Sequence, residues 1–112
     1  MNAVSTHVLD TVRGEPASGI LVRLERAGAG ELELGRGTTD ADGRIADFGV
    51  PSLSAGTYRL IFETGAYLDE VSGPGSAFFP EVVITFAADG LRPRYHVPLL
   101  LSPYSYSTYR GS

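Results

Sequence analysis

The feature that most constrains the fold is the spacing of the turns, which divide the chain into short segments. The 112 residues include 14 glycines and 7 prolines, and most of these punctuate stretches of five to eight residues. Within the stretches, apolar and polar residues alternate with a period of two, the pattern of strands with one buried face. We therefore expect an all-β chain, an antiparallel β-sandwich of two sheets with seven or eight short strands. The clearest strands are 4–10, 20–26, 31–34, 58–63, 82–86, 95–102 and 105–109.

One segment favours a helix. Residues 65–71 give about two turns, in which Tyr67, Leu68 and Val71 can share a face, and the glycines and proline of 72–75 end it. The sequence has no internal repeat, linker or low-complexity stretch. A chain of this length can bury one modest core, so residues 1–112 are expected to form a single domain.

Composition excludes several classes of function. The formal net charge is −4, all nine basic residues are arginine, and no basic run suggests nucleic acid. Cysteine is absent, which excludes disulfides, thiolate nucleophiles and Cys-ligated zinc. Two histidines are too few for a His-rich metal centre within one subunit, so we expect neither a metal nor a cofactor.

The sequence predicts no membrane association. No apolar run approaches the roughly 20 residues that a membrane helix needs. The N-terminus lacks the basic start and apolar core of a signal peptide, so a cytoplasmic protein is expected, although a removed leader would leave no trace here.

Two candidate residues lie in the first half of the chain. In strand 4–10, a period of two puts His7 on the same face as Ser5 and Leu9. The segment 39–44 is dense in turn-forming residues, and its glycine can take a positive φ. Arg44 follows this tight turn directly, where a rigid scaffold can orient its side chain.

The third candidate lies in the expected strand 95–102. Its larger apolar side chains, at 95, 97, 99 and 101, favour the core, which sends His96 outward. Pro98 has no N–H for a ladder hydrogen bond, so an edge or a bulge is expected there. The final strand alternates tyrosine with serine or threonine, a composition that suits an interface strand and also a pocket wall.

Two histidines and one arginine can form a hydrolytic site without a metal. A neutral imidazole can take a proton from water, and a second can return one to a leaving nitrogen. A guanidinium can bind a planar anion through two donors and stabilise an oxyanion. Spacing alone does not bring His7, Arg44 and His96 together. Judged by composition alone, these residues more often have surface or structural roles than catalytic ones.

A resemblance changes this balance. The motifs that carry it are Ser5-Thr6-His7-Val8-Leu9-Asp10, Thr39-Asp40-Ala41-Asp42-Gly43-Arg44, Phe78-Phe79-Pro80-Glu81, Tyr95-His96-Val97-Pro98-Leu99-Leu100-Leu101-Ser102-Pro103 and Tyr109-Arg110-Gly111-Ser112. In this order, and over essentially the whole chain, the sequence resembles the 5-hydroxyisourate hydrolases, the transthyretin-related family of purine degradation. The last tetrapeptide is the most specific part, since it separates these hydrolases from the hormone-carrying transthyretins.

The resemblance implies a fold, an assembly and a reaction. The fold would be a transthyretin-like sandwich, and four subunits would form a homotetramer, a dimer of dimers, with sites in channels at the dimer–dimer interface. By the family pattern, His7, His96 and Arg44 would be catalytic, and His7, Arg44, Tyr109 and Ser112 would contact the substrate. That substrate would be 5-hydroxyisourate, hydrolysed to 2-oxo-4-hydroxy-4-carboxy-5-ureidoimidazoline without a cofactor.

Two other functions remain open at this point. A transthyretin-type small-molecule carrier would share the fold and hold an apolar hormone in the channel. An immunoglobulin-like interaction module would be monomeric, and its C-terminal residues would be dispensable.

Overall fold

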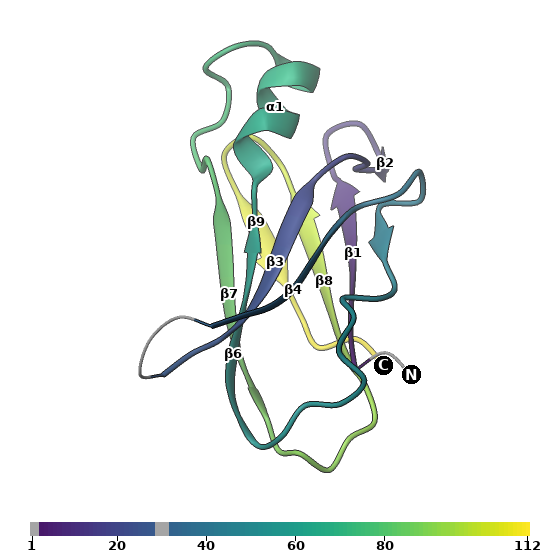
Figure 1. Ribbon diagram of the computed structural model, residues 1–112. Coiled ribbons are helices and arrows are strands. Elements are labelled where there is room, and N and C mark those ends of the chain that lie inside the picture. Colours follow the sequence, from purple (N-terminus) through teal and green to yellow (C-terminus); the bar gives the residue numbers. More distant parts are fainter. Residues whose placement is uncertain (1–2, 29–31) are drawn as a thin grey trace.

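Two packed β-sheets and one helix make up the computed structural model, which describes residues 3–28 and 32–112 (Figure 1). The first sheet, sheet A, has the order β2-β1-β8-β9, and β5 also pairs with β1. Its strands are β1 (Val4–Asp10), β2 (Glu15–Pro16), β5 (Arg44–Ile45), β8 (Tyr95–Leu101) and β9 (Tyr106–Thr108). The second sheet, sheet B, has the order β4-β3-β6-β7. Its strands are β3 (Leu21–Arg26), β4 (Leu32–Thr38), β6 (Gly56–Phe62) and β7 (Val82–Ala88).

The core lies between the two sheets, and the period-two pattern determines which side chains enter it. In β1, Val4, Thr6 and Val8 are buried, while Ser5 and His7 are half-buried. In β8, Tyr95, Val97, Leu99 and Leu101 are all buried, as the sequence predicts. Each large apolar side chain removed from water stabilises the fold by about 1.5–3 kcal/mol, so the alternation fixes which face of each strand points inward.

The predicted helix is confirmed as α1 (Thr64–Ser72), which lies at one end of the sandwich (Figure 1). Leu68 is buried, and the Tyr67 hydroxyl donates a 2.7 Å hydrogen bond to Oδ2 of the buried Asp10 at the end of β1. Burial, together with this carboxylate, raises the pKa of Tyr67, so the phenol remains a donor at neutral pH. Among the described residues, no helix has the length and apolar character needed to cross a bilayer.

The sheets differ from the expected antiparallel pattern at one place: β1 and β8 are parallel. Parallel neighbours need a long connection, and here nearly the whole chain separates the two strands. Nine strands occur within the described residues, and two of them, β2 and β5, have only two residues each. Such short strands carry no periodicity that a sequence pattern can reveal.

The expected edge at Pro98 is observed locally. On the side of β1, Pro98 pairs with His7 in regular register, without a bulge. On the other side, pairing with the C-terminal segment stops at Leu99–Thr108 and resumes only as a single bridge from His96 to Gly111, so no described strand pairs with Pro98 there. Strand β7 alternates buried and exposed residues at its start, and Val83 is 41% exposed.

The expected strand 31–34 is observed as the longer β4, and the expected strand 105–109 as the shorter β9. Glycines at 35 and 37 hide the alternation in β4, and a Cβ on Gly35 would collide with the Phe48 carbonyl oxygen. The first residue of the expected strand 31–34 falls outside the described residues.

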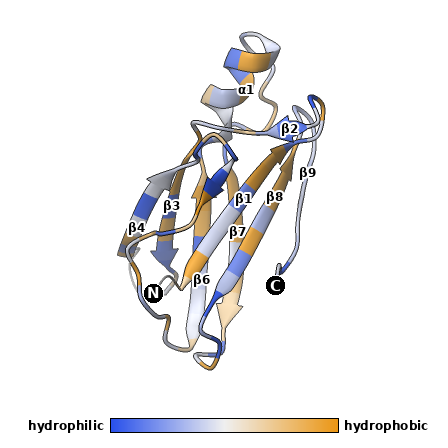
Figure 2. Ribbon diagram, turned by 90° about the vertical axis from the view of Figure 1, so that its right-hand side faces the viewer, coloured by the Kyte–Doolittle hydropathy of each residue, from blue (hydrophilic) through white to orange (hydrophobic). Residues whose placement is uncertain are grey.

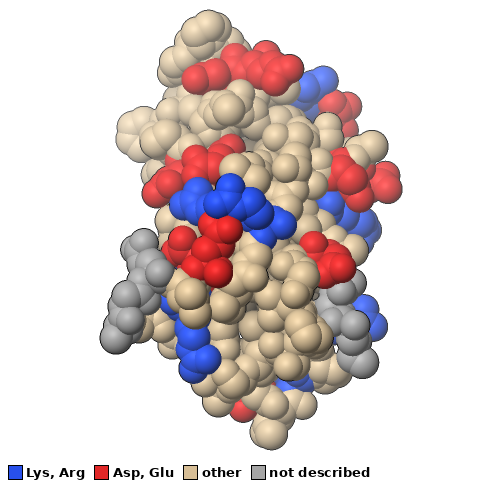
Figure 3. Space-filling view, viewed as in Figure 1, with Lys and Arg blue, Asp and Glu red and all other residues tan. Residues whose placement is uncertain are grey.

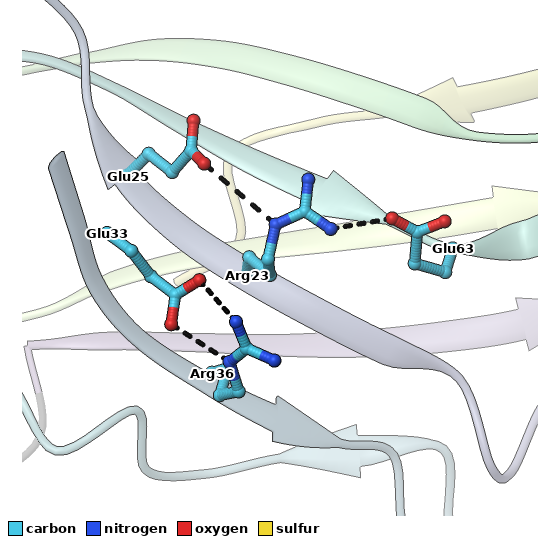
Figure 4. A network of polar contacts seen from close by, with 5 residues as sticks. All are labelled: Arg23, Glu25, Glu33, Arg36 and Glu63. Atoms are coloured by element: carbon cyan, nitrogen blue, oxygen red, sulfur yellow. Dashed lines mark hydrogen bonds and ion pairs between the residues drawn. The ribbon is translucent and has the colours of Figure 1, made fainter. Parts of the chain in front are cut away.

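The outer face of sheet B carries interleaved charges. Arg23 contacts Glu63 at 2.6 Å and Glu25 at 3.9 Å, and Arg36 binds Glu33 through two donors (Figure 4). Acidic and basic side chains lie next to one another on the face seen in Figure 3. The Arg36–Glu33 pair is exposed and the pairs of Arg23 are partly buried. Exposed pairs are screened by salt and contribute little to stability, so the alternating charges of this face are typical of a solvated surface.

Candidate active site

The pairing of β1 with β5 and β8 brings the three candidate residues together on the outer face of sheet A. His7 in β1 is the Cα partner of Arg44 in β5, and Ser5, two residues earlier, is the partner of His96 in β8. Directly paired residues project from the same face of a sheet. Figure 2 views the molecule from the side on which β1, β8 and the C-terminal segment lie side by side.

The turn before Arg44 is held by one carboxylate and by β1. Asp40 Oδ1 accepts hydrogen bonds from the N–H groups of Asp42 and Arg44, at 2.9 and 3.0 Å. The bond from Arg44, then that from Asp42 and the nearby charges of Arg44 and His7, hold the pKa of Asp40 below its ordinary value. Gly43 takes a φ of 74°, and its carbonyl accepts a 2.7 Å hydrogen bond from the Val8 N–H. This docking fixes Arg44 beside His7.

His96 is oriented by Ser5. The Ser5 hydroxyl lies 2.8 Å from His96 Nδ1, and in the described part of the chain no hydrogen-bond partner contacts Nε2, which can therefore face a ligand. The ring is half-buried. Burial lowers the pKa of His96, and the positive charges of Arg44 and His7 add to this effect. The lowered pKa favours the neutral form of the imidazole, which can accept a proton.

The last residues pass directly over His96. The Gly111 N–H donates a 2.8 Å hydrogen bond to the His96 carbonyl, and a Cβ at 111 would collide with Cδ2 of the His96 ring. Only glycine lets the backbone approach so closely. Tyr109 is 59% exposed, and the register of the flanking pairs puts it beside Pro98, the partner of His7.

A groove of about 800 Å³ opens next to this cluster. Of the five predicted site residues, Arg44, His96 and Ser112 line it, whereas His7 and Tyr109 lie outside its walls in the single chain. Sequence reasoning assigned no role to five other polar lining residues, which are Ser5, Thr6, Arg92, Arg94 and Arg110. The sequence carried a usable signal for Ser5, which shares a face with His7, and for Arg110, which belongs to the terminal tetrapeptide.

The chemistry of the groove is basic. Four guanidinium groups and one imidazole line it, and no Asp or Glu occurs among its described lining residues. Within the described ranges, no three His, Asp or Glu side chains converge in the way that a metal site requires. The arrangement can transfer protons and bind an anion.

The sequence also matches a known family model over almost its whole length. The model is described as the HIUase/Transthyretin family, and it matches residues 4–111.

The chain belongs to the HIUase/Transthyretin family.

Relatives within the family support both the fold and the sequence motifs. A 5-hydroxyisourate hydrolase of Salmonella typhimurium is 46% identical over 113 residues, covering 99% of this chain and 82% of that protein. The structure of 5-hydroxyisourate hydrolase from Klebsiella pneumoniae superposes with a TM-score of 0.85 at 39% identity, covering 100% of both chains. Transthyretin from Sparus aurata superposes with a TM-score of 0.89 at 30% identity, covering 99% of this chain and 97% of that one.

These values confirm a transthyretin-like sandwich. They also show that the backbone does not distinguish the two branches of the family, because the transthyretin has the higher TM-score and the lower identity. The side chains of the site must therefore decide the function.

The pH dependence of His96 follows from its surroundings. Because its pKa is lowered, the ring should remain neutral as the pH falls below the ordinary histidine value of about 6.5. We expect an NMR titration of the two histidines to show one imidazole with a midpoint below 6.5, and the spectrum of a His96→Asn variant identifies which it is. A midpoint at or above 6.5 for His96 would contradict the effect of burial and of the neighbouring charges.

Proposed function

We propose that the chain is a hydrolase that converts 5-hydroxyisourate to 2-oxo-4-hydroxy-4-carboxy-5-ureidoimidazoline in urate degradation. One observation carries the proposal: two histidines and Arg44, remote in sequence, meet on one sheet face next to a groove that the terminal Arg110-Gly111-Ser112 completes. The curated relatives with this name and the matching motifs support it.

The proposed chemistry uses acid/base catalysis. A water oxygen attacks the lactam carbonyl carbon while one imidazole takes its proton. The ring C–N bond then breaks, the nitrogen receives a proton from the other imidazole, and the carbonyl carbon becomes a carboxylate. His96 suits the role of base because its lowered pKa keeps it neutral, and His7 is then the proton donor.

Arg44 is the electrostatic partner in this scheme. Its backbone is fixed by the Asp40 turn, so its guanidinium can hold the substrate and stabilise the oxyanion that forms on the carbonyl oxygen. Tyr109 and Ser112 would position the substrate through their hydroxyl groups.

The alternative is a transthyretin-type carrier without catalysis, which the fold permits equally well. The groove argues against it. Pockets for apolar ligands are lined mainly by hydrophobic side chains, whereas four arginines and His96 line this one.

A direct assay tests the proposal. Freshly prepared 5-hydroxyisourate is mixed with the protein, and its ultraviolet absorbance is followed against the spontaneous decay in buffer. We expect the decay to accelerate in proportion to protein concentration. Decay at the buffer rate would refute the hydrolase and favour the carrier.

Arg44→Lys should be a severe change. Lysine keeps the charge and loses the planar pair of donors, so both substrate binding and oxyanion stabilisation suffer. We expect kcat/KM to fall roughly a hundredfold, the lower end of the range for loss of one oxyanion-stabilising donor in an active site. Arg59→Lys, on sheet B, is the matched control and should leave kcat/KM unchanged. Near-normal activity of the Arg44→Lys variant would mean that this residue supplies charge alone.

We further propose a homotetramer, a dimer of dimers. Both outer strands on one side, β7 and β9, expose aromatic or branched side chains, and Phe78, Phe79 and Tyr106 stack edge to face beside β9. Exposed apolar edges of this kind usually pair with another chain. Light scattering at micromolar concentration should give about four times the 11.9 kDa chain mass. A mass of one chain would rule out a site shared between subunits.

A further inference from the structure

The groove holds more positive charge than the proposed hydrolysis uses. Arg44 belongs to the cluster with the two histidines, but Arg92, Arg94 and Arg110 also line the groove. They come from two other segments, the loop between β7 and β8 and the C-terminal residues that pass over His96. Their concentration in one place contrasts with a net charge of −4 for the whole chain.

The loop that carries Arg92 and Arg94 is well held. Asp89 Oδ1 accepts hydrogen bonds from the Leu91 N–H and from the hydroxyl of the buried Tyr95, both at 2.9 Å. These two bonds, that from Leu91 first, lower the pKa of Asp89. One Asp89 oxygen is thus occupied by the loop backbone and by Tyr95. The other lies 3.8 Å from Arg92 Nε, a long distance for an ion pair.

The other guanidiniums have no acidic partner. The ion pairs formed by the described residues include none to Arg94, Arg110 or Arg44. Four cations along one groove repel one another, and a bound anion relieves this repulsion. Arginine is also the side chain best suited to a carboxylate, which it can bind through two parallel hydrogen bonds.

We propose that Arg92, Arg94 and Arg110 form a subsite for the carboxylate of a heterocyclic acid, because a carboxylate is the group that appears when the lactam is hydrolysed. The inference rests on the proposed function, because ring opening turns a lactam carbonyl into a carboxylate within the groove. The subsite draws the carboxylate of the product away from Arg44 and the histidines. Product bound there still occupies the groove, and it therefore competes with the substrate.

Two stable ligands test the subsite without any turnover. Orotate and uracil share a pyrimidine ring and differ by one carboxylate. Calorimetric titration of the wild-type protein at low salt should show orotate binding roughly tenfold tighter than uracil, the scale of a charge-assisted contact. The double variant Arg92→Gln/Arg94→Gln should lose this preference, with little change in uracil binding.

Controls separate a local contact from general charge. Arg59→Gln removes the same charge on sheet B and should keep the preference. Arg92→Lys/Arg94→Lys should restore part of it. Equal binding of the two ligands to the wild-type protein, or no binding of either, would overturn the subsite, as would a preference that survives in the double Gln variant.

A kinetic measurement completes the test. In the double Gln variant, we expect the inhibition constant of the accumulated product to rise roughly tenfold. If the wild-type protein hydrolyses 5-hydroxyisourate but binds orotate and uracil equally, the subsite is refuted and the proposed function stays intact. Selective orotate binding by a protein that does not accelerate hydrolysis would refute the function and leave the subsite.

Discussion

Replacing either histidine by asparagine should lower kcat/KM for 5-hydroxyisourate by about a hundredfold or more, the usual scale for loss of a general acid or base. Asparagine keeps a polar side chain of similar reach but cannot accept and return a proton near neutral pH. His96→Asn can still meet the Ser5 hydroxyl, so the 2.8 Å contact that orients residue 96 can be replaced. The measurement is the initial rate of absorbance change, corrected for spontaneous decay.

The same variants should retain the fold. Both histidines lie on the outer face of sheet A and are only half-buried, so the core between the sheets is unaffected. Thermal unfolding and light scattering are the controls. If His7→Asn or His96→Asn unfolds, or dissociates while its activity per tetramer is intact, that histidine has a structural role.

Deletion of Tyr109–Ser112 should abolish measurable hydrolysis and leave a folded protein. The pairing of β9 with β8 from Tyr106 to Thr108 survives this deletion, as does the 2.7 Å bond from the Thr108 hydroxyl to the Pro98 carbonyl. What disappears is the bridge at Gly111 and the groove wall formed by Arg110, Gly111 and Ser112. Circular dichroism should therefore match the wild-type spectrum, while the rate falls to that of buffer.

A single substitution sharpens this test. Gly111→Ala keeps every functional group of the tail but adds a Cβ that collides with the His96 ring. We expect a loss of at least tenfold in kcat/KM, because a small misplacement of catalytic groups is costly. Full activity in the truncated protein would show that the tail is dispensable, and normal activity of Gly111→Ala would show that its close approach to His96 is not needed.

Periodicity was sufficient to predict most of the architecture. The faces of β1 and β8 follow directly from their alternating residues, which put His7 on the face of Ser5 and Leu9 and send His96 outward. The parallel pairing of β1 with β8 does not follow from any local pattern, because it depends on contacts between residues about 90 positions apart. Pro98 lies at a local edge, as its missing N–H predicts, because pairing on the side of β9 is interrupted there.

The site was predictable only in part. The residues with distinctive chemistry, His7, Arg44 and His96, belong to motifs that a family resemblance identifies. Arg92 and Arg94 lie in an irregular loop, where an arginine is usually a solvated surface residue. Their position along the groove depends on how Asp89 and Tyr95 fold that loop, which no spacing rule gives.

The parallel pairing of β1 with β8 also has a consequence for synthesis on the ribosome. β1 is translated before β8, and the strand that carries His96 follows it by about 85 residues. Until then β1 has only the two-residue strands β2 and β5 as neighbours in its sheet, and such a partial sheet is unstable alone. The nascent chain remains unable to bind or hydrolyse its substrate until β8, with His96, has emerged. Pairing of β1 with β8 is then slow, because a long loop must close. The proposed activity is therefore expected only from chains whose translation has reached their last strands, and fragments released early should be inactive and prone to aggregate.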